Sequence, residues 1–240
     1  MSEKTAIVIP ARLDSIRLPN KPLIEFNGIP MIIHVVNTCR EVFDGKNVYV
    51  SSPDDQILSI CDSFQIKSIK SSKNAASGTD RLAEFARIMD YSKVINVQGD
   101  ELLLTKECLA DFIKKTEHRT NCTVGITKII SNEEFNKTSV VKVAKSDDRM
   151  IFASRSPIPN LSYSKSEISY KHTGLYMFTK DSLELFSSLT PGELEITEKV
   201  EILRFIENRV PVDVVEVSDY AFTIDTAEDV EMAKSILETK

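Results

Sequence analysis

The feature that most constrains the fold is a regular alternation of strand and helix patterns in the first half of the chain. Short apolar runs typical of buried strands alternate with segments whose apolar residues recur at helical spacing. The expected strands are 5–10, 46–52, 66–70 and 93–98, and the expected helices are 30–42, 54–64 and 79–89. This repetition predicts a parallel sheet with helices on both faces.

The second half has a different pattern, because several strand-like segments follow one another without an intervening helix. Such an order indicates an antiparallel portion of the sheet. The expected strands are 122–130, 140–145, 151–156, 173–179, 212–217 and 220–225, and the expected helices are 180–189, 193–207 and 226–240. No linker, repeat or low-complexity tract divides the halves. We therefore expect one α/β domain over residues 1–240 with a mixed sheet.

Charge and composition exclude several classes of protein. The net charge is −6 and no basic block is present, which argues against nucleic-acid binding. No apolar run is long enough to span a membrane, and the first residues do not form a signal-peptide pattern. The 4 cysteines are scattered and form no C-x-x-C pair, which is typical of reduced thiols. We expect a cytoplasmic protein without membrane insertion.

Three cations follow the first expected strand, in a stretch that also contains three prolines. This cationic loop, residues 10–23, carries Arg12, Arg17 and Lys21. Ligands of open α/β sheets bind at the carboxyl ends of the strands, and proline restricts the backbone of a loop. A restricted loop with three cations suits a triphosphate, because guanidinium and ammonium groups bind phosphate oxygens. The alternative is an ordinary solvated surface loop.

A second cluster opens the helix expected after the third strand. Gly78 would let a ligand approach the backbone, and Ser77 or Thr79 could cap the helix. A helix N-terminus favours anions and offers free N–H groups. The alternative is a helix cap without a ligand.

Two aspartates end apolar strand-like segments that lie far apart in the sequence. Asp100 follows the strand 93–98, and Asp225 ends the expected strand 220–225. Two such carboxylates could share one Mg²⁺, which binds one or two carboxylates together with phosphate oxygens and water. The alternatives are a solvated turn at Asp100 and a helix cap at Asp225. Phosphate-loop, dinucleotide and G-x-S-x-G motifs are absent, so metal-assisted phosphoryl transfer is favoured over acyl transfer.

The segments IPARLDSIRLPNKPL, SGTDR, NVQGDE, SRSPIP, YKHTGLYMF and IDTAEDV occur in the order found in 3-deoxy-manno-octulosonate cytidylyltransferases, the CMP-Kdo synthetases. The chain resembles this family over about residues 5–235. The resemblance implies a Rossmann-like nucleotidyltransferase fold, CTP and Mg²⁺ as donor and cofactor, a homodimer and a role in lipopolysaccharide biosynthesis. It also implies a nucleotide-binding half, about 1–120, and a sugar-binding and dimerisation portion, about 121–220.

The resemblance further implies roles for individual residues. Those expected at the CTP phosphates are Arg12, Arg17 and Lys21, and those near the nucleotide are Ser77, Gly78, Thr79 and Gln98. The expected metal ligands are Asp100 and Asp225. Those expected around the sugar acid are Arg155, His172, Tyr176 and Glu201. From the residues alone, these last four would be interpreted as surface or core polar groups.

The implied reaction joins a 2-keto-3-deoxy sugar acid, through its anomeric hydroxyl, to the α-phosphorus of CTP and releases pyrophosphate. Three residues depart from the family pattern: Leu102 replaces a proline, Ile202 replaces a glutamine expected to bind the sugar, and Thr173 replaces an aliphatic residue. One hypothesis is therefore a modified acceptor, such as an amino-substituted octulosonic acid, a nonulosonic acid or a phosphonate. A non-catalytic nucleotide-binding protein is disfavoured because both Asp100 and Asp225 are present.

Overall fold

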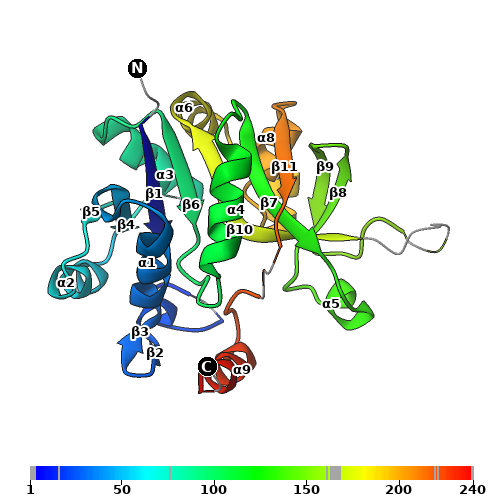
Figure 1. Ribbon diagram of the computed structural model, residues 1–240. Helices are drawn as coiled ribbons and strands as arrows, with labels where there is room; N and C mark the ends of the chain where they lie inside the picture. Colours follow the sequence, from blue (N-terminus) through cyan, green and yellow to red (C-terminus); the bar gives the residue numbers. More distant parts are fainter. Residues whose placement is uncertain are drawn as a thin grey trace.

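A large mixed sheet forms the centre of the molecule (Figure 1). The structure, a computed structural model, describes residues 4–15, 17–75, 77–160, 162, 169–218, 220 and 222–238. In spatial order the strands of the sheet are β5 (Ser68–Lys70), β4 (Val48–Ser52), β1 (Thr5–Pro10), β6 (Lys93–Val97), β10 (Tyr170–Thr179), β7 (Cys122–Lys128), β11 (Val212–Glu216), β9 (Arg149–Ser154) and β8 (Lys142–Ser146).

The sheet changes direction at the contact between β6 and β10. Strands β5, β4, β1 and β6 are parallel, as the sequence predicted, with Val8 opposite both Tyr49 and Asn96. Strand β10 then runs antiparallel to both β6 and β7, with Tyr176 opposite Asn96 and Val124. The predicted mixed sheet is confirmed, and one sheet contains strands from both halves of the chain.

Helices cover both faces of this sheet (Figure 1). Helices α1 (Met31–Val42), α2 (Asp55–Ser63) and α4 (Lys106–Thr116) pack on one face, and α3 (Gly78–Ile88) and α6 (Lys180–Ser188) pack on the other. The shorter elements are η1 (Lys21–Leu23), β2 (Glu25–Phe26), β3 (Ile29–Pro30), η2 (Gly45–Asn47), α5 (Asn132–Asn136), α7 (Glu193–Glu198) and α8 (Leu203–Glu207), and the last helix is α9 (Ala227–Glu238).

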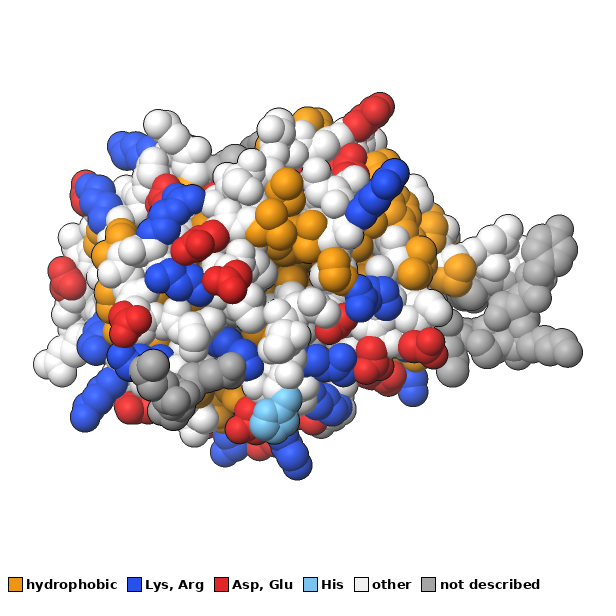
Figure 2. Space-filling model, turned by 90° about the horizontal axis from the view of Figure 1, so that it is seen from above, with side chains coloured by type: hydrophobic (Ala, Val, Ile, Leu, Met, Phe, Trp, Pro, Cys, Tyr) orange, Lys and Arg blue, Asp and Glu red, His pale blue; other side chains and the backbone are white. Residues whose placement is uncertain are grey.

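The surface carries charges of both signs. On the face shown in Figure 2, basic and acidic side chains are interspersed, without a continuous block of either sign. In the described part of the chain, no helix has the length and apolar composition that crossing a membrane requires.

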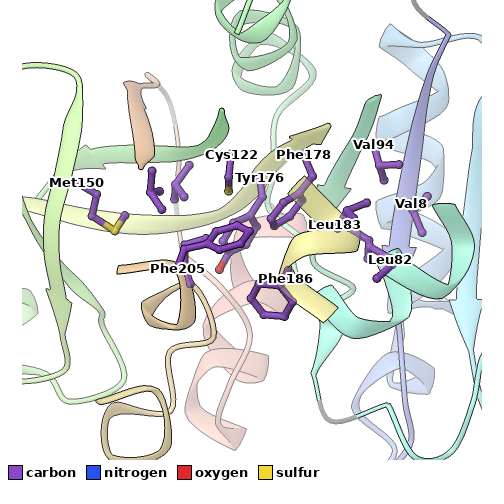
Figure 3. Packing of buried hydrophobic residues seen from close by; sticks show 14 of the residues in the cluster. Val8, Leu82, Val94, Cys122, Met150, Tyr176, Phe178, Leu183, Phe186 and Phe205 are labelled. Atoms are coloured by element: carbon purple, nitrogen blue, oxygen red, sulfur yellow. The ribbon is translucent and has the colours of Figure 1, made fainter. Parts of the chain in front are cut away.

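The core on the α3 and α6 face is rich in aromatic residues (Figure 3). Phe186 and Phe205 meet edge to face at 5.3 Å between ring centroids, and Tyr176 stacks on Phe178 at 5.8 Å. Burial of each such side chain stabilises the fold by about 1.5–3 kcal/mol. Tyr176 therefore anchors a strand that also reaches the cavity described below.

A separate, smaller core lies beside α9. Its buried members, which we call the α9 cluster, are Phe26, Met31, Leu102, Leu103, Ile224, Val230 and Ala233. They come from the strand after the cationic loop, the start of α1, the loop after β6, the segment before α9 and α9 itself. Leu102 thus occupies the position of the expected proline as a buried apolar contact.

Two predicted elements are wrong. Residues 220 and 222–225 form no strand; the segment contributes Ile224 to the α9 cluster, and the Ile224 N–H donates to the Asp100 carbonyl at 3.2 Å. The helix predicted over 193–207 is interrupted, because Lys199 adopts a left-handed conformation with φ 55° between α7 and α8. Helices α4 (106–116) and α5 (132–136) are not among the elements expected from the sequence.

Candidate active site

A cavity of about 1180 Å³ opens where β1 and β6 end, and residues of both halves line it. Eleven of the thirteen residues singled out in the sequence line this cavity: Arg12, Arg17, Ser77, Gly78, Gln98, Asp100, Arg155, His172, Tyr176, Glu201 and Asp225. Lys21 and Thr79 lie directly behind it, each bonded to a lining residue. The structure therefore gathers in one place residues that are spread over most of the sequence.

Lys21 joins the two aspartates. Its ammonium lies 2.5 Å from Asp100 Oδ2 and 3.1 Å from Asp225 Oδ1, and it donates to the Ile224 carbonyl at 2.9 Å. Arg17 Nη2 lies 3.0 Å from the same Asp225 oxygen. Burial alone lowers the pKa of Lys21, but the two carboxylates outweigh it and raise the pKa above its ordinary value. Lys21 is therefore charged at neutral pH.

The segment before α9 is fixed in two ways. The Ile224 N–H binds the Asp100 carbonyl, as described above, and the backbone N–H groups of Asp225 and Thr226 donate to Asp229 Oδ2 at 2.9 and 2.8 Å. Thr226 Oγ1 accepts from the Asp229 N–H at 3.2 Å, so Thr226, and not Asp225, caps α9. Asp225 is thus held beside Asp100 without a strand.

The two aspartates offer a donor set that fits Mg²⁺. Both provide hard carboxylate oxygens, and Mg²⁺ completes its coordination with water and phosphate oxygens. Among the described residues, no group of three or more His, Cys, Asp or Glu side chains could hold a metal. The set therefore matches a cation that shares its ligands with a phosphate, and it does not match a closed zinc site.

The cationic loop is held against the neighbouring strands and helices. The Ala11 N–H donates to the Ser51 carbonyl at 2.9 Å, and the Leu13 N–H donates to Asp54 Oδ2 at 2.8 Å. Arg12, between them, lines the cavity. These contacts give the start of the loop a defined position relative to β4 and α2.

A further buried cation, Arg81, lies near this loop and was not predicted. Its Nη1 donates to the Ser77 carbonyl at 3.0 Å, and its Nη2 donates to the Ala75 carbonyl at 3.4 Å. Burial lowers the pKa of Arg81, and the nearby charge of Arg12 lowers it further. Its position in the SGTDR stretch, two residues after Thr79, was the available signal.

The N-terminus of α3 forms one end of the cavity. Ser77, not Thr79, caps the helix, because Ser77 Oγ accepts from the Asp80 N–H at 3.1 Å. A Cβ at Gly78 would meet Pro10, Gln98 and Glu201 at 3.5–3.6 Å. Gly78 therefore lies at the junction of β1, the end of β6 and the segment before α8.

On another wall of the cavity, His172 and Tyr176 form a pair on β10. The Tyr176 hydroxyl lies 2.5 Å from His172 Nε2. Burial lowers the pKa of His172 to about 4, with a further contribution from the charge of Arg155. His172 is therefore neutral at pH 7, and its ring hydrogen-bonds Tyr176 at the cavity wall.

Most of the hydrogen-bond donors of Arg155 are already used. Nε donates to the Glu198 carbonyl at 2.7 Å, and Nη1 donates to the Thr138 and Ser139 carbonyls at 3.0 and 3.3 Å. Nη2 donates to the Lys199 carbonyl at 3.4 Å. A guanidinium has five N–H donors, so one remains for a ligand.

Glu101 lies buried beside Asp100 and was not among the predicted site residues. It accepts hydrogen bonds from Tyr220 Oη at 2.8 Å and from Thr223 Oγ1 at 3.2 Å. A Cβ at Gly174 would collide with its carboxylate, so this position requires glycine. Burial raises the pKa of Glu101 to about 8, and the charge of Asp100 adds to this effect. Its place in the QGDE stretch was the available signal.

Ile202 lies in the core and does not line the cavity. Its side chain is 1% exposed and belongs to the cluster that contains Tyr176 and Phe205, whereas its neighbours Val200 and Glu201 line the cavity. The position of Ile202 therefore gives no support to an acceptor pocket rebuilt around it.

Comparison with known proteins gives a consistent result. Residues 6–214 match the family model described as cytidylyltransferase. The 3-deoxy-manno-octulosonate cytidylyltransferase of Chloroherpeton thalassium is 36% identical, with 99% of each chain covered. The enzyme of the same name from Wolinella succinogenes is also 36% identical, over 96% of this chain and 98% of its own.

A solved structure described as CMP:2-keto-3-deoxy-manno-octonic acid synthetase complexed with CTP has the same fold. It aligns with a TM-score of 0.90 and 30% identity, over 98% of this chain and 99% of its own. This likeness confirms the predicted nucleotidyltransferase fold. Because the family model and the relatives cover nearly the whole chain, the protein belongs to the 3-deoxy-manno-octulosonate cytidylyltransferase family.

Proposed function

We propose that the protein transfers CMP from CTP to the anomeric hydroxyl of 3-deoxy-manno-octulosonate (Kdo) and releases pyrophosphate. The observation that carries the proposal is the single cavity that joins the cationic loop, the aspartate pair and the sugar-side residues. The names of the relatives and the CTP complex of the similar structure support the choice of both substrates.

The cationic loop would bind the triphosphate. Arg12, Arg17 and Lys21 provide three positive charges, and Lys21 keeps its proton because its pKa is raised. The N-terminus of α3, with Gly78 at the cavity wall, offers backbone that a nucleoside can approach closely. These groups would hold the α-phosphorus in one orientation and balance the charge that develops on the departing pyrophosphate.

Asp100 and Asp225 would hold Mg²⁺ together with oxygens of the triphosphate. When bound, the ion supplies Lewis-acid stabilisation of charge on the phosphate oxygens. Removal of divalent cations with EDTA should abolish turnover, and added Mg²⁺ should restore it. Turnover that persists in EDTA would contradict the assignment of the aspartates.

In the reaction, the anomeric hydroxyl oxygen forms a bond to the α-phosphorus, and the bond from this phosphorus to the bridging oxygen of pyrophosphate breaks. The hydroxyl proton is released to solvent. His172, neutral at pH 7, and Tyr176 offer hydrogen-bonding groups to the hydroxyls of the sugar. The protein would contribute to the reaction by binding the two anionic substrates next to each other and by neutralising their charge.

The proposal is tested by pyrophosphate release from CTP and Mg²⁺ with Kdo as acceptor, and by mass spectrometry of the product. ATP and UTP serve as donor controls, and an amino-substituted octulosonic acid, a nonulosonic acid and a phosphonate serve as acceptor controls. We expect release with CTP and Kdo and formation of CMP-Kdo. Release with another acceptor but none with Kdo would overturn the assignment.

We expect the protein to act in the cytoplasm, where CTP is available, and to form a homodimer, as the family resemblance implies. Among the described residues of the second half, four large apolar side chains are more than half exposed: Ile130 at 89%, Ile151 at 55%, Ile196 at 55% and Met232 at 52%. Such side chains are candidates for a contact between subunits. Light scattering of the purified protein measures the mass in solution, and a monomer at micromolar concentration would contradict the dimer.

A further inference from the structure

We propose that Lys199 is a specificity-determining residue whose ammonium binds the carboxylate of the acceptor. The inference deepens the proposed function and rests on it, because it assumes that the acceptor is a sugar acid. It starts from the hydrogen-bond donors of Arg155, the cation that the sequence assigned to this half of the cavity.

Arg155 cannot hold a carboxylate with two parallel hydrogen bonds while its present contacts persist. Four of its five N–H donors bind backbone carbonyls. The usual grip of arginine on a carboxylate requires two N–H donors on one edge of the guanidinium. Arg155 therefore fixes two segments of backbone at the cavity wall, 138–139 and 198–199, and leaves room for a second cation to bind the acceptor.

Lys199 lies next to Arg155 and lines the same cavity. Its carbonyl accepts from Arg155 Nη2, and its side chain is exposed. The other cavity lysines that the structure describes are each paired with a glutamate: Lys128 with Glu216 at 3.3 Å, Lys137 with Glu133 at 2.8 Å, and Lys171 with Glu134. Among the described residues, no glutamate or aspartate forms a hydrogen bond or ion pair with the Lys199 ammonium.

The backbone conformation at position 199 is one in which lysine is uncommon. Lys199 follows the last residue of α7 in the left-handed conformation, with φ 55°, and its N–H donates to the Glu195 carbonyl at 2.9 Å. Glycine and asparagine are the residues favoured at this position, because a Cβ is strained there. A lysine at a site that favours glycine, in the lining of a cavity, favours a contact that the side chain provides.

The test compares Lys199→Gly with a matched control. Arg209 follows α8 with φ 59°, is exposed and does not line the cavity. Lys199→Gly and Arg209→Gly therefore each remove one positive charge and relieve the same backbone conformation. Neither should lower the melting temperature. Only Lys199→Gly should raise the KM for Kdo, by about tenfold to a hundredfold, the range expected for a hydrogen bond to a charged group. The KM for CTP should be unchanged.

A second measurement tests the chemical partner of the ammonium. Kdo amide, which lacks the negative charge, should be a poorer acceptor for the wild-type protein, but Lys199→Gly should cause no further loss with it. Lys199→Arg should retain most of the affinity for Kdo. Equal losses with Kdo and its amide would overturn the proposal, and so would a rise in the KM for CTP instead of Kdo.

The wild-type assay separates this inference from the proposed function. If the wild type turns over Kdo and Lys199→Gly leaves the KM for Kdo within twofold, the inference alone is overturned. If the wild type turns over no sugar acid, the proposed function is overturned, and this inference falls with it.

Discussion

Glu201 accepts a hydrogen bond from the backbone N–H of Thr79 at 3.0 Å. The contact joins the segment before α8 to the first turn of α3, and these elements come from the two halves of the chain. The family resemblance places Glu201 at the sugar acid. The observed bond shows that its carboxylate also fixes the helix end beside Gly78.

We predict that Glu201→Ala weakens CTP binding. The change leaves the Thr79 N–H without its acceptor, which costs about 1 kcal/mol and corresponds to a KM for CTP raised about fivefold. Glu201→Gln retains an oxygen that can accept this bond and should bind CTP nearly normally. Steady-state kinetics with each substrate varied in turn measures both values. An effect of Glu201→Ala on Kdo alone would show that the Thr79 bond is unimportant for the nucleotide.

Asp225→Asn should abolish most of the activity without unfolding the protein. The amide keeps the shape of the side chain but loses the negative charge next to Arg17 and Lys21. We expect kcat to fall by at least about a hundredfold, the scale seen when one electrostatic contact to a transition state is lost. Asp55→Asn is the control, since Asp55 pairs with Lys70 at the surface. Full turnover of Asp225→Asn at saturating Mg²⁺ would contradict the metal assignment.

The stability of the protein should depend on His172 between pH 4 and 6.5. The pKa of His172 is about 4 in the folded state, below its ordinary value of 6.5. In this window the unfolded chain binds a proton that the folded chain does not, so stability falls as the pH decreases. The slope from this group is about 1 kcal/mol per pH unit. Urea unfolding at several pH values should show a shallower dependence for His172→Gln, and identical slopes would contradict the assignment.

Arg204→Met should destabilise the fold strongly. Arg204 is 2% exposed, binds Glu195 through two hydrogen bonds at 2.7 and 2.8 Å, and lies 3.1 Å from Asp80. Removal of one partner of a buried ion pair costs about 3–5 kcal/mol. The double variant Glu195→Gln with Arg204→Met should recover part of this loss in denaturant unfolding. A single variant as stable as the wild type would show that water replaces the guanidinium.

Ile202→Gln should lower stability without altering acceptor choice. The side chain lies in the aromatic core, so the new amide would be buried without a partner, at a cost of about 1–3 kcal/mol. The ratio of kcat/KM between Kdo and an amino-substituted octulosonic acid should be unchanged. A shifted ratio would show that position 202 reaches the acceptor after all.

The sequence predicted the strands and helices of residues 5–98 well, because their patterns are local. Strands β1, β4 and β6 are almost completely buried and rich in β-branched apolar residues, which is the pattern of a strand covered on both faces. Parallel strands bring their carboxyl ends to one edge of the sheet, so the sequence alone predicts that Arg12 and Asp100 lie near each other.

The errors arose where tertiary contacts override the local pattern. The sequence of 220–225 resembles a strand because apolar residues alternate with others, but Ile224 belongs to the α9 cluster, Tyr220 hydrogen-bonds Glu101, and residues 220 and 222–225 form no strand. The sequence does not predict that α7 ends at Lys199, because the residue in the left-handed conformation there is a lysine and not the usual glycine. The roles of Arg81 and Glu101 depend on burial, which a single sequence does not specify residue by residue.

The α9 cluster has a consequence for synthesis on the ribosome. Phe26 and Leu102 belong to segments made early, whereas Ile224, Val230 and Ala233 are made last, and all pack in one small core. A nascent chain that lacks residues 222–238 has the cationic loop and Asp100 but neither Asp225 nor the apolar side chains that hold both loops. Strands β1, β4 and β6 can pair long before that point. The pairing of β1, β4 and β6 therefore needs no residue of the last segment, whereas the approach of Asp225 to Asp100 depends on residues that are synthesised last.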